Sequence, residues 1–270
     1  MHPRALDSHL AVRAFNVDIA RIEDQVSSVA VGRLRMQFWR DAIEGVFSGH
    51  RPPAEPVAVL LHKVLREDGA PLSRGFFRKV IASRVEQYLG GVPFPTLDAL
   101  ETYAENTYSS LLYLALESFH HHSITLDHIA SHIGKATGIA AVLRGMPHLA
   151  FPPARTSAAT VVFPLDVCVE YNLRQEAILR HGGAAPGLGD AVFKVATLAN
   201  DHLITARKML GDAGEEGKGD VFAGFLTAVP TALYLERLEA VDFDPFHKSL
   251  QKRAWKLPWR AYRAFSTKRF

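Results

Sequence analysis

Apolar residues recur at intervals of three and four positions along nearly the whole chain, whereas alternation with a period of two is rare. The first spacing places side chains on one face of an α-helix, and the second is typical of a half-buried strand. The pattern therefore predicts an all-α protein. The expected helices cover residues 10–22, 28–47, 55–67, 72–89, 96–119, 125–145, 187–210, 220–239 and 245–256.

The connections between these helices are short, and the longest irregular stretch is expected at residues 147–163, where three prolines interrupt the helical pattern. No internal repeat is visible and no linker separates two cores. We therefore expect a single domain over residues 10–262, followed by a short basic tail over residues 263–270.

Composition excludes several classes of protein. Hydrophobic residues make up 48% of the chain and charged residues 22%, which is typical of a globular chain and not of a disordered one. The single cysteine, Cys168, can form neither an intrachain disulfide nor a cysteine-based zinc site, which fits a reducing compartment. The uncharged run over residues 221–235 is shorter than the roughly 18 apolar residues that span a membrane, so we expect buried helices there.

The net charge of +3 is distributed unevenly, because residues 248–270 hold eight of the 31 Lys and Arg residues and no Asp or Glu. Residues 1–247 thus contain 23 basic and all 28 acidic side chains, so this part of the chain has a net negative charge. An acidic body argues against a nucleic-acid partner. The first 15 residues have neither a long apolar core nor an Arg- and Ser-rich composition, so no targeting segment is expected within this chain.

Two interleaved sets of side chains characterise residues 253–265. The aromatic set is Trp255, Trp259, Tyr262 and Phe265, and the basic set is Arg253, Lys256, Arg260 and Arg263. On a helix these spacings give neighbouring aromatic and basic stripes that suit an anionic lipid interface, although Pro258 interrupts such a helix. The candidates for membrane contact are Trp255, Lys256, Trp259, Arg260 and Arg263. The alternative is that the rings pack against the domain and the basic side chains are solvated.

A zinc site is a second candidate. His128 and His132 have the i, i+4 spacing of zinc ligands, and Asp127 is adjacent. However, Lys135 continues the same helix face and would place an ammonium group where a cation would bind. We therefore expect histidines that pack between helices, and no metal.

Several segments resemble the squalene/phytoene synthase family, in the family's order and spacing. They are AFNVDIARIED (residues 14–24), RMQFWR (35–40), YAENT (103–107), SHIGKATGIAAVLR (131–144) and VFPLD (162–166). The similarity spans roughly residues 10–262. It implies a helical bundle of the isoprenoid-synthase type around a central cavity, in which aspartates on two facing helices bind Mg²⁺ and two prenyl diphosphates.

The aspartates of both helices are largely missing here. Ala20 stands where the first acid of the family belongs, Arg21 follows it, and Asp24 remains. The second helix has Gly138, Ala141 and Gly145 where the family has Gln, Asn and Asp. Mg²⁺ prefers carboxylate oxygens beside substrate phosphates, so we expect a protein without catalytic activity and without a cofactor.

Within the family, residues 35–39, 103–114, 131–136 and 242–246 are similar to the mitochondrial assembly factors of respiratory complex I. This resemblance implies a non-catalytic role on the matrix side of the inner membrane, with complex I subunits or other assembly factors as partners. Two alternatives stay open. One is an active prenyltransferase with another metal arrangement, and the other is a carrier that holds an isoprenoid or lipid in the former cavity.

An unusually polar patch lies within the helix expected over residues 96–119. It comprises Glu105, Asn106, Ser109, Ser110 and Tyr113. Because buried polar groups need partners, the patch either forms a hydrogen-bond network between helices or lines a cavity inherited from the synthases. The candidate cavity-lining residues are Tyr103, Glu105, Asn106, Ser109, His132 and Arg144.

Overall fold

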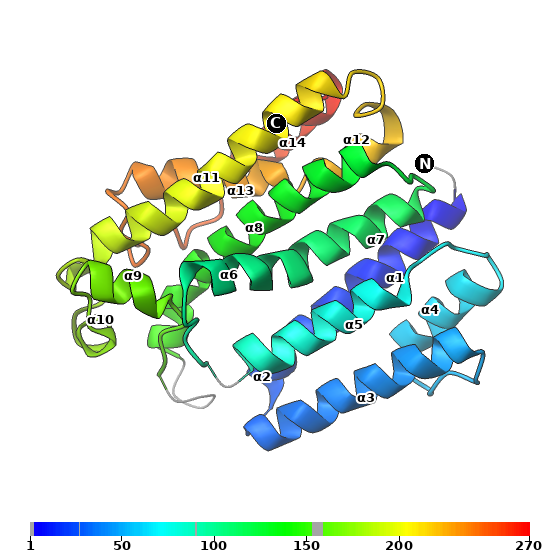
Figure 1. Ribbon diagram of the computed structural model, residues 1–270, viewed down its shortest axis with the longest axis horizontal. Coiled ribbons are helices and arrows are strands. Elements are labelled where there is room, and N and C mark those ends of the chain that lie inside the picture. Colours follow the sequence, from blue (N-terminus) through cyan, green and yellow to red (C-terminus); the bar gives the residue numbers. More distant parts are fainter. Residues whose placement is uncertain (1–2, 27, 90, 153–158) are drawn as a thin grey trace.

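The computed structural model describes residues 3–26, 28–89, 91–152 and 159–270, without the side chains of residues 3–5, 23, 24, 87 and 88. These residues form helices and contain no β-strand, which confirms the expected all-α class (Figure 1). The α-helices are α1 (Pro3–Ala20), α2 (Ile22–Gln25), α3 (Val29–Ser48), α4 (Pro56–Arg66), α5 (Arg74–Ser83), α6 (Leu97–Ala104), α7 (Ser110–Ser118), α8 (Ile124–Ala150), α9 (Leu165–Glu170), α10 (Gln175–His181), α11 (Leu188–Asp212), α12 (Phe222–Phe225), α13 (Ala228–Glu239) and α14 (Leu257–Thr267).

Local caps explain where several helices begin and end. The Ser28 hydroxyl accepts a hydrogen bond from the backbone N–H of Val31 at the start of α3, and Gly49 ends that helix with a φ of 80°. Side-chain oxygens of Thr96 and Ser123 cap α6 and α8 in the same way. These groups satisfy backbone donors that have no partner within the helix.

Helix α7 lies between two clusters of buried side chains. Leu111 and Leu114 belong to the cluster formed with α1, α3, α4 and α5, in which the ring of Phe15 contacts those of Trp39 and Phe77 edge-on. Other residues of α7 belong to the larger cluster around α8, α11 and α13. Because both faces of α7 are buried, the two clusters form one continuous interior.

Two π-helical turns, η1 (Arg84–Tyr88) and η2 (Glu105–Ser109), extend α5 and join α6 to α7. Each replaces the regular hydrogen bonding of a helix that the sequence pattern predicts as uninterrupted. Turns of this kind widen the helix locally and often occur where function or tight packing requires it. Helix α8 approaches the backbone of η2 closely.

Small residues permit this approach. An ideal Cβ on Gly138 would lie 2.5 Å from Ala104 Cβ and 2.8 Å from Ala104 Cα, and one on Gly134 would overlap the backbone of Ser109. Gly134 and Gly138 therefore face a neighbouring helix. Backbone of η2 and of the end of α6 fills the space beside both positions.

The structure corrects the expected C-terminal helix. Residues 245–256 form turns, because Asp242 and Phe243 have left-handed backbones (φ 55° and 57°) and the Arg237 guanidinium binds the carbonyls of Ser249 and Lys252. The last helix is α14, with Pro258 in its first turn, where proline is tolerated. Helices α9 and α10 were not expected, and α8 continues through Pro147 to Ala150.

The segment Gly219–Glu239 is long and apolar enough to cross a membrane, but 67% of its apolar 18-residue window is buried inside the fold. It contains α12 and α13, whose side chains pack in the larger cluster. The expectation of buried helices over residues 221–235 is confirmed.

We predict that Gly134→Ala lowers the free energy of unfolding by about 1–3 kcal/mol, since the new methyl group forces α8 away from η2. Gly211→Ala is the matched control. No atom lies within 4 Å of a Cβ at that helical position, so alanine there should be neutral or stabilising by up to about 1 kcal/mol. Urea unfolding measures both, and an unchanged midpoint for Gly134→Ala would contradict the close approach.

Candidate functional site

The positions at which the family resemblance places metal-binding residues lie at the C-terminal end of α1, in α2 and along α8. Ala20 is the last residue of α1, and exposed Arg21 separates α1 from α2. The side chain of Asp24 lies outside the described residues. On α8, Gly138 packs against Ala104, and none of the residues at 138, 141 and 145 has a side-chain oxygen or nitrogen. These three positions of α8 supply no side-chain ligand for Mg²⁺.

Glu105 is the centre of a network that joins η2, α7 and α8. The Tyr113 hydroxyl donates to Glu105 Oε1 at 2.6 Å, and the Ser131 hydroxyl donates to Glu105 Oε2 at 2.7 Å. Ser109 Oγ donates to the carbonyl of Ser131 at 3.0 Å. Burial and the hydrogen bond to Glu105 raise the pKa of Tyr113 well above its usual value. The predicted hydrogen-bond network is therefore confirmed for Glu105, Ser109 and Tyr113.

A second polar cluster connects α6, α8 and α11. Lys135 Nζ donates to Glu101 Oε1 at 2.8 Å, and His202 Nε2 lies 3.5 Å from the same oxygen. The Nδ1 atoms of His132 and His202 are 2.9 Å apart, so one neutral ring donates to the other. Burial, helped by the Lys135 ammonium, lowers the pKa of both histidines. Burial favours the neutral form of Glu101, but the hydrogen bond from Lys135 and its charge hold the pKa of that carboxyl below its usual value.

His132 thus packs against another helix, as the sequence indicates, while His128 is exposed. Within the described part of the chain, no three His, Cys, Asp or Glu side chains are placed to hold a metal ion. The ammonium group of Lys135 lies beside His132 and would repel a metal cation bound there. The cluster is a hydrogen-bonded contact between three helices.

A pocket of about 730 Å³ opens beside the C-terminal end of α8. Arg144, Arg180 and Lys248 contribute positive charge to its wall, and none of the described residues that line it is acidic. Tyr234 also lines it, and its buried hydroxyl has no hydrogen-bond partner among the described residues. Burial raises the pKa of Tyr234. Glu176 pairs with Arg180, so Arg144 and Lys248 are the side chains of this wall that favour an anionic ligand.

The bundle and the two motif-bearing helices define a class of protein: the chain belongs to the squalene/phytoene synthase family. The family profile matches residues 1–263. Two solved structures share the fold. A squalene synthase, HpnC, from Alicyclobacillus acidocaldarius has a TM-score of 0.68 at 14% identity, covering 88% of this chain and 84% of its own. A dehydrosqualene synthase has a TM-score of 0.73 at 15% identity, covering 98% and 87%.

Relatives of much higher identity are named NADH dehydrogenase (ubiquinone) complex I, assembly factor 6. The protein of Rattus norvegicus is 40% identical over 252 residues, which are 93% of this chain and 71% of the relative. The protein of Homo sapiens is 36% identical over 255 residues, 94% and 72% of the two chains. A homolog from Drosophila melanogaster is 35% identical over 258 residues, 93% and 73% of the chains.

The candidate cavity residues do not lie together. Arg144 lines the pocket beside α8, whereas Tyr103 is buried in the core and His132 belongs to the second polar cluster. Sequence reasoning missed Glu101, His202 and Tyr234. Glu101 is one helical turn before Glu105 and could have been found as part of the same polar face. The other two depend on contacts with distant helices and carry no local signal.

The membrane-contact candidates lie in and just before α14. The alternative that their rings pack against the domain is wrong, because Trp255 is 82% exposed and Trp259 is 66% exposed. Lys256 and Arg263 are also exposed, while Arg260 binds Glu236 of α13. Contact of these residues with a membrane stays a prediction.

The lowered pKa values of His132 and His202 predict a loss of stability in acid. Below the ordinary histidine pKa of 6.5, His132 and His202 are protonated in the unfolded chain but stay neutral in the folded chain. The free energy of unfolding therefore falls as the pH decreases from about 6.5 toward the folded pKa values. Urea midpoints at pH values of about 7.5 and 5.5 measure this loss.

The double variant His132→Gln/His202→Gln should show a smaller difference between the two midpoints than the unmodified chain. The exposed His128→Gln on the same helix is the matched control and should retain the full difference. Some dependence should remain in every variant, because burial also lowers the pKa of His9. An equal pH dependence in the double variant and the control would exclude the histidine pair as its source.

Proposed function

We propose that this protein is a non-catalytic factor in the assembly of respiratory complex I. The observation that carries the proposal is its 40% identity, over 93% of its length, to a protein named as a complex I assembly factor. Identity to the synthases of known structure is only 14–15%. Fold alone does not determine function, so the more similar relatives indicate the role.

The geometry supports the absence of catalysis. Prenyl transfer needs ions that neutralise the diphosphate leaving group. Gly138, Ala141 and Gly145 offer no carboxylate, and Ala20 offers none on α1. The close approach at Gly138 further fills the space with backbone and the ring of Tyr108. Asp24 alone would remain as an acid of the former motifs.

The partners we propose are complex I subunits or other assembly factors, and the location is the matrix side of the mitochondrial inner membrane. Relatives named for complex I assembly support the compartment. The single thiol of Cys168, buried and without a disulfide, suits a reducing compartment.

The basic pocket favours a second candidate function, a carrier that binds a prenyl diphosphate without reaction. Arg144 and Lys248 would meet the phosphates. Mass spectrometry of protein incubated with farnesyl diphosphate tests this function. Retention of intact ligand that Arg144→Gln abolishes would support it, and no retention would exclude it.

For the assembly role, deletion of the gene from its own organism should deplete fully assembled complex I, and reintroduction of the chain should restore it. Blue-native electrophoresis of mitochondrial membranes measures the amount of complex. Respiratory complex III is the internal control and should not change. If assembly and ligand carriage are separate functions, Arg144→Gln should restore complex I as well as the unmodified chain does. Normal complex I after the deletion would contradict the proposal.

A further inference from the structure

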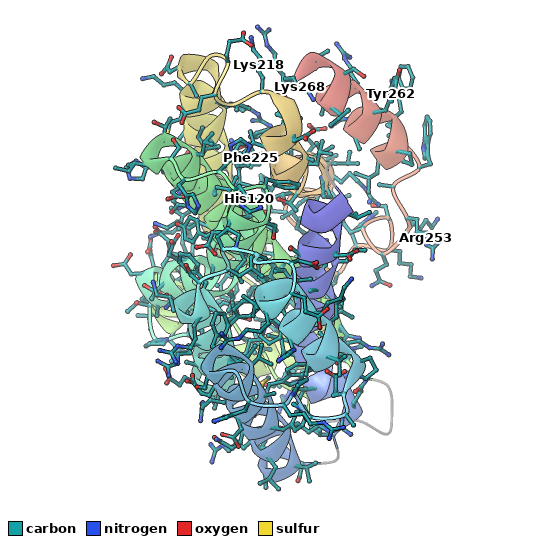
Figure 2. The ribbon with its side chains drawn as sticks, turned by 90° about the vertical axis from the view of Figure 1, so that its right-hand side faces the viewer. His120, Lys218, Phe225, Arg253, Tyr262 and Lys268 are labelled. Carbon is teal, nitrogen blue, oxygen red and sulfur yellow. The ribbon has the colours of Figure 1, made fainter. Side chains whose placement is uncertain are left out.

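Four aromatic side chains near the C-terminus are exposed. Their exposed fractions are 82% for Trp255, 66% for Trp259, 65% for Tyr262 and 43% for Phe265. Figure 2 shows Tyr262 on the outer side of α14, at the edge of the molecule. Large apolar side chains gathered on one exposed surface indicate a site of interaction.

Helix α14 turns its small side chains toward the protein core and its large aromatic side chains away from it. The side of the helix that packs on the large cluster carries Leu257, Ala261 and Ala264. The opposite side carries the rings of Trp259 and Tyr262, whose centroids are 6.0 Å apart. Folding thus buries the small side chains of α14 and leaves its largest apolar groups outside, available to something other than the core.

This surface is held in place by the fold. Arg260 Nη1 donates to both carboxylate oxygens of Glu236 on α13, at 2.7 and 2.6 Å. Arg207 Nε of α11 donates to the carbonyl of Phe270 at 2.8 Å. The rings therefore stand on a helix fixed to the bundle at both ends.

The same surface is strongly basic. Lys256 Nζ lies 5.6 Å from the ring centroid of Trp255, and Lys268 Nζ lies 3.6 Å from that of Phe265. A groove of about 1010 Å³ runs along the flank of α14, between the ring side and the side packed on the bundle, and it is lined by six basic side chains and one acid, Glu236. Two of the basic side chains form ion pairs, Arg260 with Glu236 and Lys218 with Glu215. The basic side chains are Arg207, Lys218, Arg260, Arg263, Lys268 and Arg269.

We propose that the aromatic face of α14 docks on the surface of an anionic phospholipid bilayer. Tryptophan and tyrosine rings are stable at the depth of lipid headgroups. The surrounding ammonium and guanidinium groups complement lipid phosphates, and residues 248–270 contain no acid that would oppose them. The acidic remainder of the chain is repelled by such a surface, so the docking is directed to this end of the molecule.

This inference deepens the proposed location at the inner membrane and is independent of the role in assembly. Lipid binding without any effect on complex I would refute only the assembly role. Loss of complex I on gene deletion without lipid binding would refute only the docking surface.

Flotation of the full chain with vesicles tests the proposal. The chain should float with vesicles of cardiolipin and phosphatidylcholine at least tenfold more than with phosphatidylcholine alone, and less as salt rises from about 0.1 to 0.5 M. Trp259→Ala/Tyr262→Ala and Lys256→Gln/Arg263→Gln should each reduce flotation at least fivefold. Phe193→Ala, which removes an exposed ring from α11, is the matched control and should float like the unmodified chain.

Tryptophan fluorescence shows whether the rings enter the lipid. The chain has one other tryptophan, Trp39, which is buried. A blue shift and quenching by brominated lipid would therefore report on Trp255 and Trp259. Flotation without quenching would overturn the insertion of the rings. Equal flotation of the ring variant and the Phe193→Ala control would overturn the docking face. Failure to float, with concentration-dependent dimers in gel filtration, would assign the face to a second copy of this chain instead.

Discussion

The close approach of α8 to the π-helical turn η2 is the constraint on which the rest of the structure depends. It requires glycine at 134 and 138, because a Cβ at either position would overlap Ser109 or Ala104. Once the two backbones are this close, Glu105 can reach both Tyr113 and Ser131. The polar contacts then specify the register of the helices, since partly satisfied buried groups are costly.

The same contact organises the centre of the bundle. Helix α8 packs on α6, η2, α11 and α13. Its glycines at 134 and 138 permit the approach to η2 and to the end of α6. A protein with the non-catalytic role that we propose needs no acid at 138, 141 or 145, so small residues can serve helix packing along this part of α8.

Elements that depend on local signals could be predicted from the sequence. The sequence predicts a helix over residues 28–47 where α3 covers Val29–Ser48, because Ser28 and Gly49 flank it and its apolar residues recur regularly. The segment 245–256 could not be predicted, since Arg237 holds its carbonyls from a distant helix. The contact between His132 and His202 could not be predicted either, because it depends on the crossing of α8 and α11. The exposure of the α14 rings likewise follows from which side of that helix meets the core.

We propose that this fold acts as a scaffold and not as an enzyme. An assay for release of diphosphate from farnesyl diphosphate in the presence of Mg²⁺ tests this proposal. We expect no release above the protein-free background over hours, and none when geranylgeranyl diphosphate is supplied. Turnover at an ordinary enzymatic rate, on the order of 1 per second, with a coupled prenyl product, would contradict it.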